Sequence, residues 1–278
     1  MSDLSGRWAL VTGAGSGIGR ETALALARRG ADLALCDLDA EGLEATRRDA
    51  EALGRRTLAR VVDVADRDAM RAFADAVHAE IPAVDILVNN AGVGVAAAFT
   101  DTLLEDWDWI VGINLMGVVH GCHFFVPRMI ERGRGGHVVN LSSMAGYVAG
   151  GGASAYTTTK FGVRGLSECL RAELAPKGIG VSAICPGMIN TPIVARMRAR
   201  GPGAPENMRR AVEIFRRRNY PPSRVAAGIL EAIRRNKAVA PIAPEARISW
   251  VLVRLFPGLV RWSVAKIYAR RPGSAPPP

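Results

Sequence analysis

The sequence predicts an α/β fold: a doubly wound parallel sheet of about seven strands with helices on both faces. Two observations carry this prediction. Short apolar runs alternate with longer helical segments along most of the chain, and a glycine-rich turn over 13–19 joins the first apolar run to the first helix. Strands that alternate with helices pair in parallel, so their carboxyl ends should meet at one edge of the sheet, where such folds bind ligands.

Each expected element follows from its local pattern. A short aliphatic run between turn signals predicts a buried strand, and a longer segment with apolar residues at helical spacing predicts a helix. Strands are expected over 7–12, 32–36, 57–62, 84–88, 135–141, 179–185 and 237–240. One helix is expected to open at the turn over 13–19 and to run to about Arg29, and further helices are expected over 40–53, 66–80, 103–132, 155–175 and 222–235. In the long helix Asn114 lies among apolar residues, where a buried amide needs hydrogen-bond partners.

The composition is that of a globular protein. Of 278 residues, 49% are hydrophobic and 22% charged, and we expect one domain over 1–245 followed by a C-terminal extension over 246–278. The four cysteines show no paired spacing, the N-terminus shows no signal peptide, and no uncharged apolar run reaches about 18 residues. These features predict a reduced, cytoplasmic protein without a transmembrane helix.

The formal net charge of +10 raises the question of an anionic partner. No nucleic-acid-binding motif accompanies that charge, and the excess of basic residues is concentrated after residue 195. We therefore expect no nucleic-acid partner, and we also expect no metal site.

The turn over 13–19 is suited to a dinucleotide. Glycines at a strand-to-helix turn let the backbone approach a pyrophosphate, and the helix N-terminus supplies free N–H groups. Asp37 follows about twenty residues later, where a carboxylate binds an adenosine ribose and repels a 2′-phosphate. No basic residue stands at Ser16, Leu38 or Asp39 to receive that phosphate, which favours NAD over NADP. The alternative is that Asp37 only caps the next helix, a task that Asp39 can also perform.

Tyr156 and Lys160 form the strongest candidate for chemistry. They are four residues apart, so a helix places both side chains on one face. A nearby ammonium favours the phenolate and lowers the tyrosine pKa from about 10, which suits a general acid/base. Ser143 precedes them across a glycine-rich loop, just beyond the strand expected over 135–141. The alternative is a packed aromatic ring beside a solvated lysine.

The motifs, taken in order, resemble the short-chain dehydrogenase/reductase family in its compact single-domain form. The resemblance covers about residues 5–240. It rests on TGAGSGIG at 12–19, Asp63-Val64, NNAG at 89–92, Asn114, Ser143, Tyr156-x-x-x-Lys160, and Pro186-Gly187 followed by Thr191. It implies a Rossmann-like fold and hydride transfer between a nicotinamide cofactor and a CH–OH donor or the matching ketone.

The resemblance also implies roles for individual residues. Tyr156 is expected to be the general acid/base, and Ser143, rather than its neighbour Ser142, is expected to orient the substrate oxygen. Lys160 is expected to hold the nicotinamide ribose, and Asn114 to position a water in a proton relay to that lysine. Cofactor contacts are implied for Gly13, Ser16, Gly17, Ile18, Gly19, Asp37, Asp63, Val64, Asn90, Ala91, Gly92, Tyr156, Lys160, Pro186, Gly187, Ile189 and Thr191.

The surroundings of the expected site favour a lipophilic alcohol or ketone, such as a steroid, a retinoid-like compound or a long-chain lipid. The residues concerned are mostly small or apolar: Val93, Val95, Ala145, Tyr147, Val148, Ala149, Met188 and Ile193. The alternative is that half of them belong to the core. The basic segment 192–218 is expected to form two short helices with a hinge that cover the substrate. Its arginines either form a solvated face or meet an acidic substrate group.

The segment 248–271 mixes tryptophan, aliphatic and basic residues, and Pro257-Gly258 is expected to divide it into two short helices. Two interpretations stay open: docking on protein, and peripheral contact with an anionic membrane. The end at 276–278 is expected to be disordered. By analogy with the family we expect a homodimer or homotetramer, paired through the helices near 103–132 and 155–175.

Two other functions stay open beside that of an NAD-dependent oxidoreductase. The first is an NADP-dependent ketone reductase, which Asp37 disfavours. The second is a non-catalytic dinucleotide-binding or peripheral membrane protein. The joint presence of the four candidate catalytic residues disfavours a silent protein, and the C-terminal extension alone speaks for membrane binding.

Overall fold

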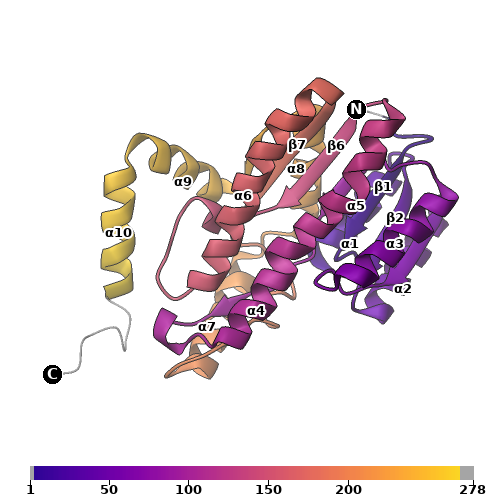
Figure 1. The fold of residues 1–278 in the computed structure, drawn as a ribbon. Helices are drawn as coiled ribbons and strands as arrows, with labels where there is room; N and C mark the ends of the chain where they lie inside the picture. Colours follow the sequence, from indigo (N-terminus) through magenta and orange to yellow (C-terminus); the bar gives the residue numbers. More distant parts are fainter. Residues whose placement is uncertain (1–2, 270–278) are drawn as a thin grey trace.

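The computed structural model describes residues 3–269, so the expectation of disorder at 276–278 lies outside the described residues. Seven parallel strands form one sheet in the order β3-β2-β1-β4-β6-β7-β9, which confirms the predicted fold class (Figure 1). The strands are β1 (Trp8–Thr12), β2 (Asp32–Asp37), β3 (Thr57–Val61), β4 (Ile86–Asn89), β6 (Gly136–Leu141), β7 (Ile179–Pro186) and β9 (Val239–Ile242). The chain runs outward from β1 in both directions, so β1 and β4 flank the switch point of the sheet.

Ten α-helices are described. They are α1 (Gly17–Ala27), α2 (Ala40–Ala52), α3 (Arg67–Glu80), α4 (Leu104–Val111), α5 (Gly117–Arg132), α6 (Ser154–Leu174), α7 (Ala204–Arg218), α8 (Pro222–Arg234), α9 (Pro244–Leu255) and α10 (Pro257–Ala269). Asp39 caps α2 by accepting a hydrogen bond from the Gly42 N–H, as one interpretation of the sequence predicted. Pro257 begins α10, where its missing N–H costs nothing.

The alternation of side chains along β1 divides the core into two layers. Ala9 and Val11 pack toward α1 and α8, whereas Trp8 and Leu10 pack toward α3, α5 and α6. This is the two-residue period of a strand that is buried on both faces. Because neither face of the sheet meets water, the ligand site is left to the edge where the strands end.

The helix expected over 103–132 is one continuous helical stretch with an irregular turn inside it. The wider turn η2 (Gly112–Met116) separates α4 from α5 and carries the buried Asn114. By length and composition alone, the stretch Leu104–Arg132 could cross a membrane, although the sequence predicted no such segment. Half of its most apolar window is buried, and it packs on α3, α6 and β4, so this apolar character is explained by the core.

The segment over 192–218 differs from its prediction. Only its second half is a helix, α7; its first half includes the two-residue strand β8 (Arg198–Ala199), which pairs in parallel with β5 (Val95–Ala96). Neither short strand was predicted, because two residues carry no measurable alternation. The Arg198 N–H donates to the Gly94 carbonyl at 3.0 Å, and the Arg200 N–H donates to the Ala96 carbonyl at 3.2 Å. We call residues 192–203 the covering segment.

A buried carboxylate fastens the covering segment to the domain. Asp106, on α4, has no exposed surface. Its oxygens accept hydrogen bonds from Arg198 at 3.1 Å and from Arg200 at 2.9 and 3.1 Å. The Arg198 guanidinium also lies 3.8 Å from the centre of the Trp109 ring. A buried carboxylate needs such partners. The two arginines are therefore bound to Asp106, although their side chains stay 39% and 42% exposed.

We expect Asp106→Ala to loosen the covering segment. Loss of about 2 kcal/mol of charge-assisted hydrogen bonding should speed hydrogen exchange at the Arg198 and Arg200 amides by roughly thirtyfold. Asp108→Ala is the matched control, because Asp108 is exposed on the same helix. Equal exchange rates in the two variants would show that the carboxylate does not hold the segment.

His137, in β6, is a second buried ionisable group with a testable consequence. This ring is buried and lies 2.8 Å from Ser182 Oγ, whose own proton goes to the Lys237 carbonyl, so His137 Nε2 carries the donating hydrogen. Burial, assisted by the nearby Arg171 charge, lowers the pKa of His137 to about 4. The unfolded chain takes up this proton near pH 6.5 and the folded chain near pH 4. Stability should therefore fall as the pH falls between these values, by up to about 3 kcal/mol for this group.

His137→Gln keeps an N–H donor toward Ser182 but cannot titrate. Its free energy of unfolding, measured by urea denaturation, should therefore depend less on pH between 4 and 6.5 than that of the wild type. His123→Gln is the control, because His123 is exposed. The same pH slope in all three proteins would contradict the assignment.

Candidate functional site

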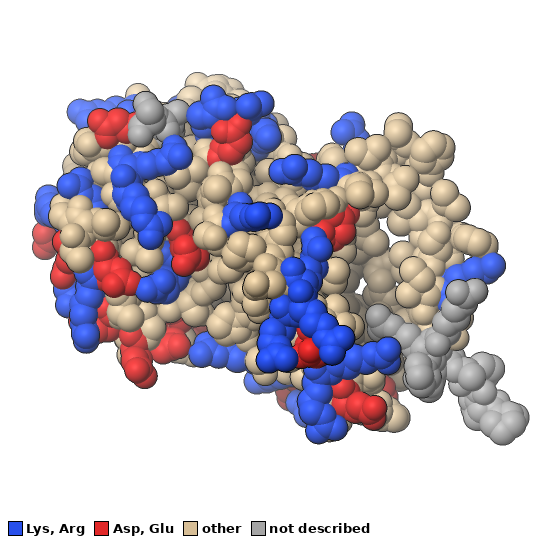
Figure 2. Space-filling model, turned by 180° about the vertical axis from the view of Figure 1, so that it is seen from behind, with Lys and Arg blue, Asp and Glu red and all other residues tan. Residues whose placement is uncertain are grey.

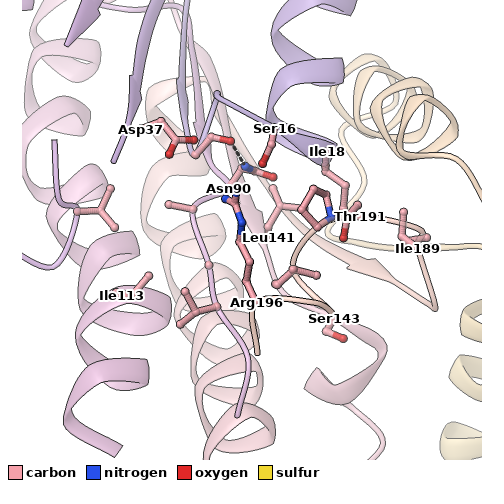
Figure 3. Close-up of a pocket in the computed structure, with 18 of the residues that line it drawn as sticks. Ser16, Ile18, Asp37, Asn90, Ile113, Leu141, Ser143, Ile189, Thr191 and Arg196 are labelled. Carbon is pink, nitrogen blue, oxygen red and sulfur yellow. Dashed lines mark hydrogen bonds between the residues drawn. The ribbon is translucent and has the colours of Figure 1, made fainter. Parts of the chain in front are cut away.

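A cavity of about 550 Å³ opens at the carboxyl ends of β1, β2, β4, β6 and β7 (Figure 3). The predicted site residues that line it come from segments far apart in the chain: Gly13, Ser16, Gly17, Ile18, Asp37, Asp63, Val64, Asn90, Ala91, Gly92, Ser143, Tyr156, Lys160, Pro186, Gly187, Ile189 and Thr191. Of the predicted set, Gly19 and Asn114 do not line the cavity. Both lie behind its wall, and each has a packing reason for its position.

The glycine turn has the shape that a pyrophosphate needs. Gly13 has a left-handed backbone with φ of 65°, and a Cβ at Gly19 would overlap the Gly13 carbonyl oxygen. Ser16, the N-cap of α1, makes no side-chain hydrogen bond to the helix, and the first turn of α1 holds no acidic residue. The first amides of α1 therefore keep their capacity for an anion at the cavity wall.

Asp37 closes the same turn from the end of β2. Its Oδ2 accepts from the Gly15 N–H at 2.7 Å, and its Oδ1 accepts from the Asp39 N–H at 2.9 Å. The carboxylate is thus fixed at one end of the cavity, with its remaining lone pairs available to a hydroxyl donor. Asp39, not Asp37, caps α2, so the alternative role for Asp37 is filled by its neighbour.

Arg196 is a cavity residue that the sequence analysis missed. It comes from the covering segment, and its guanidinium lies 3.4 Å from Asp39 Oδ2, toward the end of the cavity where Asp37 lies (Figure 3). Only Ser16, Leu38 and Asp39 were expected positions for a phosphate-binding cation. Arg196 is 157 positions from Asp39, and nothing in its local pattern distinguishes it from the other arginines of its segment.

The motif NNAG ties β4 to β1. Asn90 Nδ2 donates to the carbonyls of Thr12 at 2.9 Å and Gly13 at 3.0 Å, and the Thr12 hydroxyl accepts from the N–H groups of Asn90 and Ala91. These bonds satisfy backbone groups at the switch point, where the two strand ends separate. Asn90 therefore fixes the shape of the cavity wall beside the glycine turn.

Ser143, Tyr156 and Lys160 line one part of the cavity. Lys160 is buried, and its Nζ donates to the Leu141 carbonyl at 2.8 Å, at the end of β6. Nζ lies 5.7 Å from the centre of the Tyr156 ring. Ser142 Oγ donates to the Lys160 carbonyl at 2.8 Å, which gives that serine a structural bond, whereas Ser143 holds the turn after β6 by accepting from the Ala145 N–H.

The titration of this pair differs from the sequence expectation. Burial raises the pKa of Tyr156, an effect that hydrogen bonding with Ser143 opposes, and burial lowers the pKa of Lys160 to about 8. The expected lowering of the tyrosine pKa by Lys160 is not seen, because both groups are enclosed and the ammonium is directed to the Leu141 carbonyl. In the protein alone, Tyr156 is therefore a neutral phenol at neutral pH.

Asn114 is fully hydrogen-bonded, as its burial required. Its Oδ1 accepts from the Val93 N–H at 2.8 Å, and its Nδ2 donates to the Val93 carbonyl at 2.9 Å and to Thr159 Oγ1 at 3.3 Å. A Cβ added to Gly92 would lie 3.2 Å from Asn114 Oδ1 and 3.5 Å from Lys160 Nζ. Asn114 thus supports the wall in front of Lys160 from a turn type that is frequent at functional sites.

Four of the eight residues proposed to surround the substrate divide into two groups. Val93 and Ile193 line the cavity. Val95 and Tyr147 are buried instead; the Tyr147 hydroxyl donates to the Ala246 carbonyl at 2.6 Å, and its ring lies 5.0 Å from that of Trp250. The interpretation of Tyr147 as a substrate residue was therefore wrong, because its ring and hydroxyl attach α9 to the domain.

Comparison with known proteins agrees with this architecture. The family model for short chain dehydrogenases matches residues 7–201. "Probable oxidoreductase EphD" of Mycobacterium tuberculosis is 45% identical over 256 residues, which are 90% of this chain but 43% of that relative. The chain thus spans less than half the length of EphD. SadH of the same organism, also named as an oxidoreductase, is 38% identical over 276 residues, with 96% of this chain and 99% of SadH covered.

Among solved structures, a short-chain dehydrogenase/reductase from Burkholderia phymatum in complex with NAD is similar over the full length of both chains, with a TM-score of 0.83 and 29% sequence identity. The family match, the full-length relative and the order of the strands all point the same way. The chain belongs to the short-chain dehydrogenase/reductase family.

Proposed function

We propose that this protein is an NAD-dependent oxidoreductase that interconverts an alcohol and a ketone. The observation that carries the proposal is the convergence of Ser143, Tyr156 and Lys160 on the cavity that the glycine turn and Asp37 also line. A non-catalytic dinucleotide-binding protein needs the glycine turn, but it does not need an enclosed phenol and ammonium at the other end of the cavity. The family membership supports the reaction class.

In the proposed mechanism the nicotinamide supplies the hydride acceptor or donor. During oxidation, Tyr156 as phenolate would take the hydroxyl proton of the substrate; during reduction, the neutral phenol would return that proton to the carbonyl oxygen. Ser143 donates a hydrogen bond that holds the substrate oxygen. In this proposal Lys160 holds the ribose hydroxyls, and Asn114 supports the wall in front of Lys160. The water relay through Asn114 stays a prediction.

The preference for NAD rests on Asp37, whose carboxylate would repel a 2′-phosphate. One observation favours the second candidate, an NADP-dependent reductase: Arg196 brings a cation to the same end of the cavity. In the structure that cation is paired with Asp39, and Asp37 keeps its two backbone bonds. An arginine already paired with a carboxylate is a poorer phosphate ligand, so we favour NAD.

The proposed substrate is a lipophilic alcohol or ketone. Val93, Ile113 and Ile193 line the cavity, and Arg196, the one arginine among the described residues that line it, lies toward the adenosine end rather than beside Tyr156. Phosphate or CoA recognition by the arginines of the covering segment finds less support, since Arg198 and Arg200 are bound to Asp106. A cytoplasmic location is also proposed; all four cysteines are free thiols, as a reducing compartment requires.

We expect Tyr156→Phe to reduce turnover at least a hundredfold while NAD binding stays within a few-fold of the wild type, because only the acid/base group is lost. The assay follows NADH absorbance with a panel of lipophilic secondary alcohols and short polar sugars. Tyr220→Phe, which lies outside the cavity, is the control. Near-normal turnover in Tyr156→Phe would contradict the assignment, and turnover of sugars ahead of every lipophilic alcohol would contradict the substrate class.

The cofactor proposal is tested by calorimetry of NADH and NADPH. We expect NADH to bind the wild type at least tenfold more tightly, and Asp37→Ala to remove most of that preference because the repulsive carboxylate is gone. Arg196→Ala separates the alternatives, with Arg209→Ala as an exposed control from the neighbouring helix. Equal or tighter NADPH binding by the wild type, lost in Arg196→Ala alone, would replace the NAD proposal by the NADP one.

A further inference from the structure

The first turn of α9 contacts two loops that follow neighbouring strands of the sheet. One loop follows β6 and begins beside Ser143; the other follows β7 and begins at Gly187. Both residues line the cavity, on the other side of β1 from Asp37. In the proposed function Asp37 takes the adenosine, so these two loops flank the end of the cavity that takes the nicotinamide.

Glu245, the second residue of α9, contacts the loop after β7. Its Oε1 accepts a hydrogen bond from the Met188 N–H at 2.9 Å. A Cβ added to Gly187 would overlap the Glu245 carboxylate, so the side chain lies directly against the backbone of this turn. A hydrogen bond to an ionised carboxylate is stronger than one to a neutral acceptor. Glu245 therefore fixes the turn at the point where the turn lines the cavity.

The next residue of α9 contacts the loop after β6. The Ala246 carbonyl accepts from the Tyr147 hydroxyl at 2.6 Å, and Ala246 is fully buried. One helical turn later, the Trp250 ring lies 5.0 Å from the Tyr147 ring and 5.5 Å from the Arg164 guanidinium. Two adjacent residues of one helix thus hold both loops, so the distance between the loops depends on α9.

The end of α7 also meets Glu245. Arg218, the last residue of α7, forms an ion pair with the Glu245 carboxylate. The side chains of Arg216 and Arg217 are 74% and 79% exposed, whereas that of Arg218 is 28% exposed. Figure 2 shows basic side chains gathered on this surface beside the C-terminal extension. Arg218 departs from the solvated face that its neighbours form, and its charge balances that of Glu245.

The backbone just before α9 is strained. Ala243 is buried and has φ of 88° and ψ of 152°, a region that few residues other than glycine adopt. Such a conformation costs stability and persists only where the surrounding contacts determine it. Here it lies in the turn that leads from β9 to Glu245. The contacts that α9 makes with the two loops offset this cost.

We propose that Glu245 is a positioning residue for the nicotinamide end of the cavity. It acts through the Met188 N–H, while α9 keeps this turn and the loop beside Ser143 at a fixed distance. Glu245 is not among the described residues that line the cavity, so its effect on a ligand passes through the turn. The inference rests on the proposed function, which assigns the nicotinamide to this end. It gives the start of the C-terminal extension a task in docking on protein; membrane contact through 248–271 stays a prediction.

The test compares NADH with ADP-ribose, which lacks the nicotinamide, by calorimetry on the full chain. Glu245→Ala should weaken NADH binding about tenfold, because the turn loses a charge-assisted hydrogen bond. ADP-ribose binding should stay within about twofold of the wild type, because the residues at the Asp37 end do not contact Glu245. The stoichiometry of ADP-ribose binding measures the folded fraction of each variant, so a loss of stability does not imitate the effect.

Two further variants separate positioning from a general structural role. Glu245→Gln keeps an acceptor for the Met188 N–H and should bind NADH within about threefold of the wild type. Glu231→Ala is the matched control, because Glu231 also pairs with an arginine, Arg234, but is not among the described residues that line the cavity. It should change the binding of neither ligand.

Unchanged NADH binding in Glu245→Ala would overturn the proposal. So would an equal loss of NADH and ADP-ribose binding in that variant, or a loss in Glu245→Gln as large as that in Glu245→Ala. A wild type that binds neither ligand would contradict the proposed function, and this inference with it.

Discussion

The site depends on the burial of one ammonium group. Lys160 leaves water almost completely, and its Nζ is held by the Leu141 carbonyl at the end of β6. Removing a charged amine from water is costly unless it gains a strong acceptor, so the lysine is stable only where α6 lies directly against that strand end. The Ser142 hydroxyl adds a bond to the Lys160 carbonyl. The same contact therefore sets the distance between Tyr156 on α6 and Ser143 on the loop after β6.

The other wall of the cavity is built on the same principle of satisfied buried polar groups. Asn114 completes its hydrogen bonds with both backbone groups of Val93, and Asn90 does so with the carbonyls of Thr12 and Gly13. Gly92 lies against Asn114 and Lys160, since a Cβ at this position would lie 3.2 Å from Asn114 Oδ1 and 3.5 Å from Lys160 Nζ. The ends of β1, β4 and β6, helix α6 and the turn η2 are thus held together by buried polar side chains. Breaking any of these contacts would leave a buried polar group without a hydrogen-bond partner.

Much of this architecture could be predicted from local pattern. The seven strands of the sheet follow from short aliphatic runs, and the largest error in their position is the shift of the last from 237–240 to 239–242. The cavity residues Gly13, Asp37, Ser143, Tyr156 and Lys160 were predicted because each occupies a strand end or a helix start. At these places the chain direction alone determines which edge of the sheet a side chain reaches.

The features that escaped prediction are contacts between distant segments. The pairing of β5 with β8, the hold of Asp106 on two arginines, and the reach of Arg196 toward Asp39 leave no periodic mark in the sequence. The hinge expected within 192–218 agrees with the break before α7, but it did not indicate that residues before the break would form a strand. The pKa of Tyr156 was expected in the wrong direction for a similar reason, since enclosure is a property of the folded cavity and not of residue spacing.

The most direct test of the account is the ionisation of Tyr156, followed by ultraviolet difference absorbance of the wild type against Tyr156→Phe. In the protein alone, the enclosed phenol should ionise only at a pH above the ordinary tyrosine value. With NAD added, the positive charge of the oxidised nicotinamide should stabilise the phenolate and move the transition toward neutral pH. The same transition with and without NAD would contradict the account, because Tyr156 would then not face the reacting end of the cofactor.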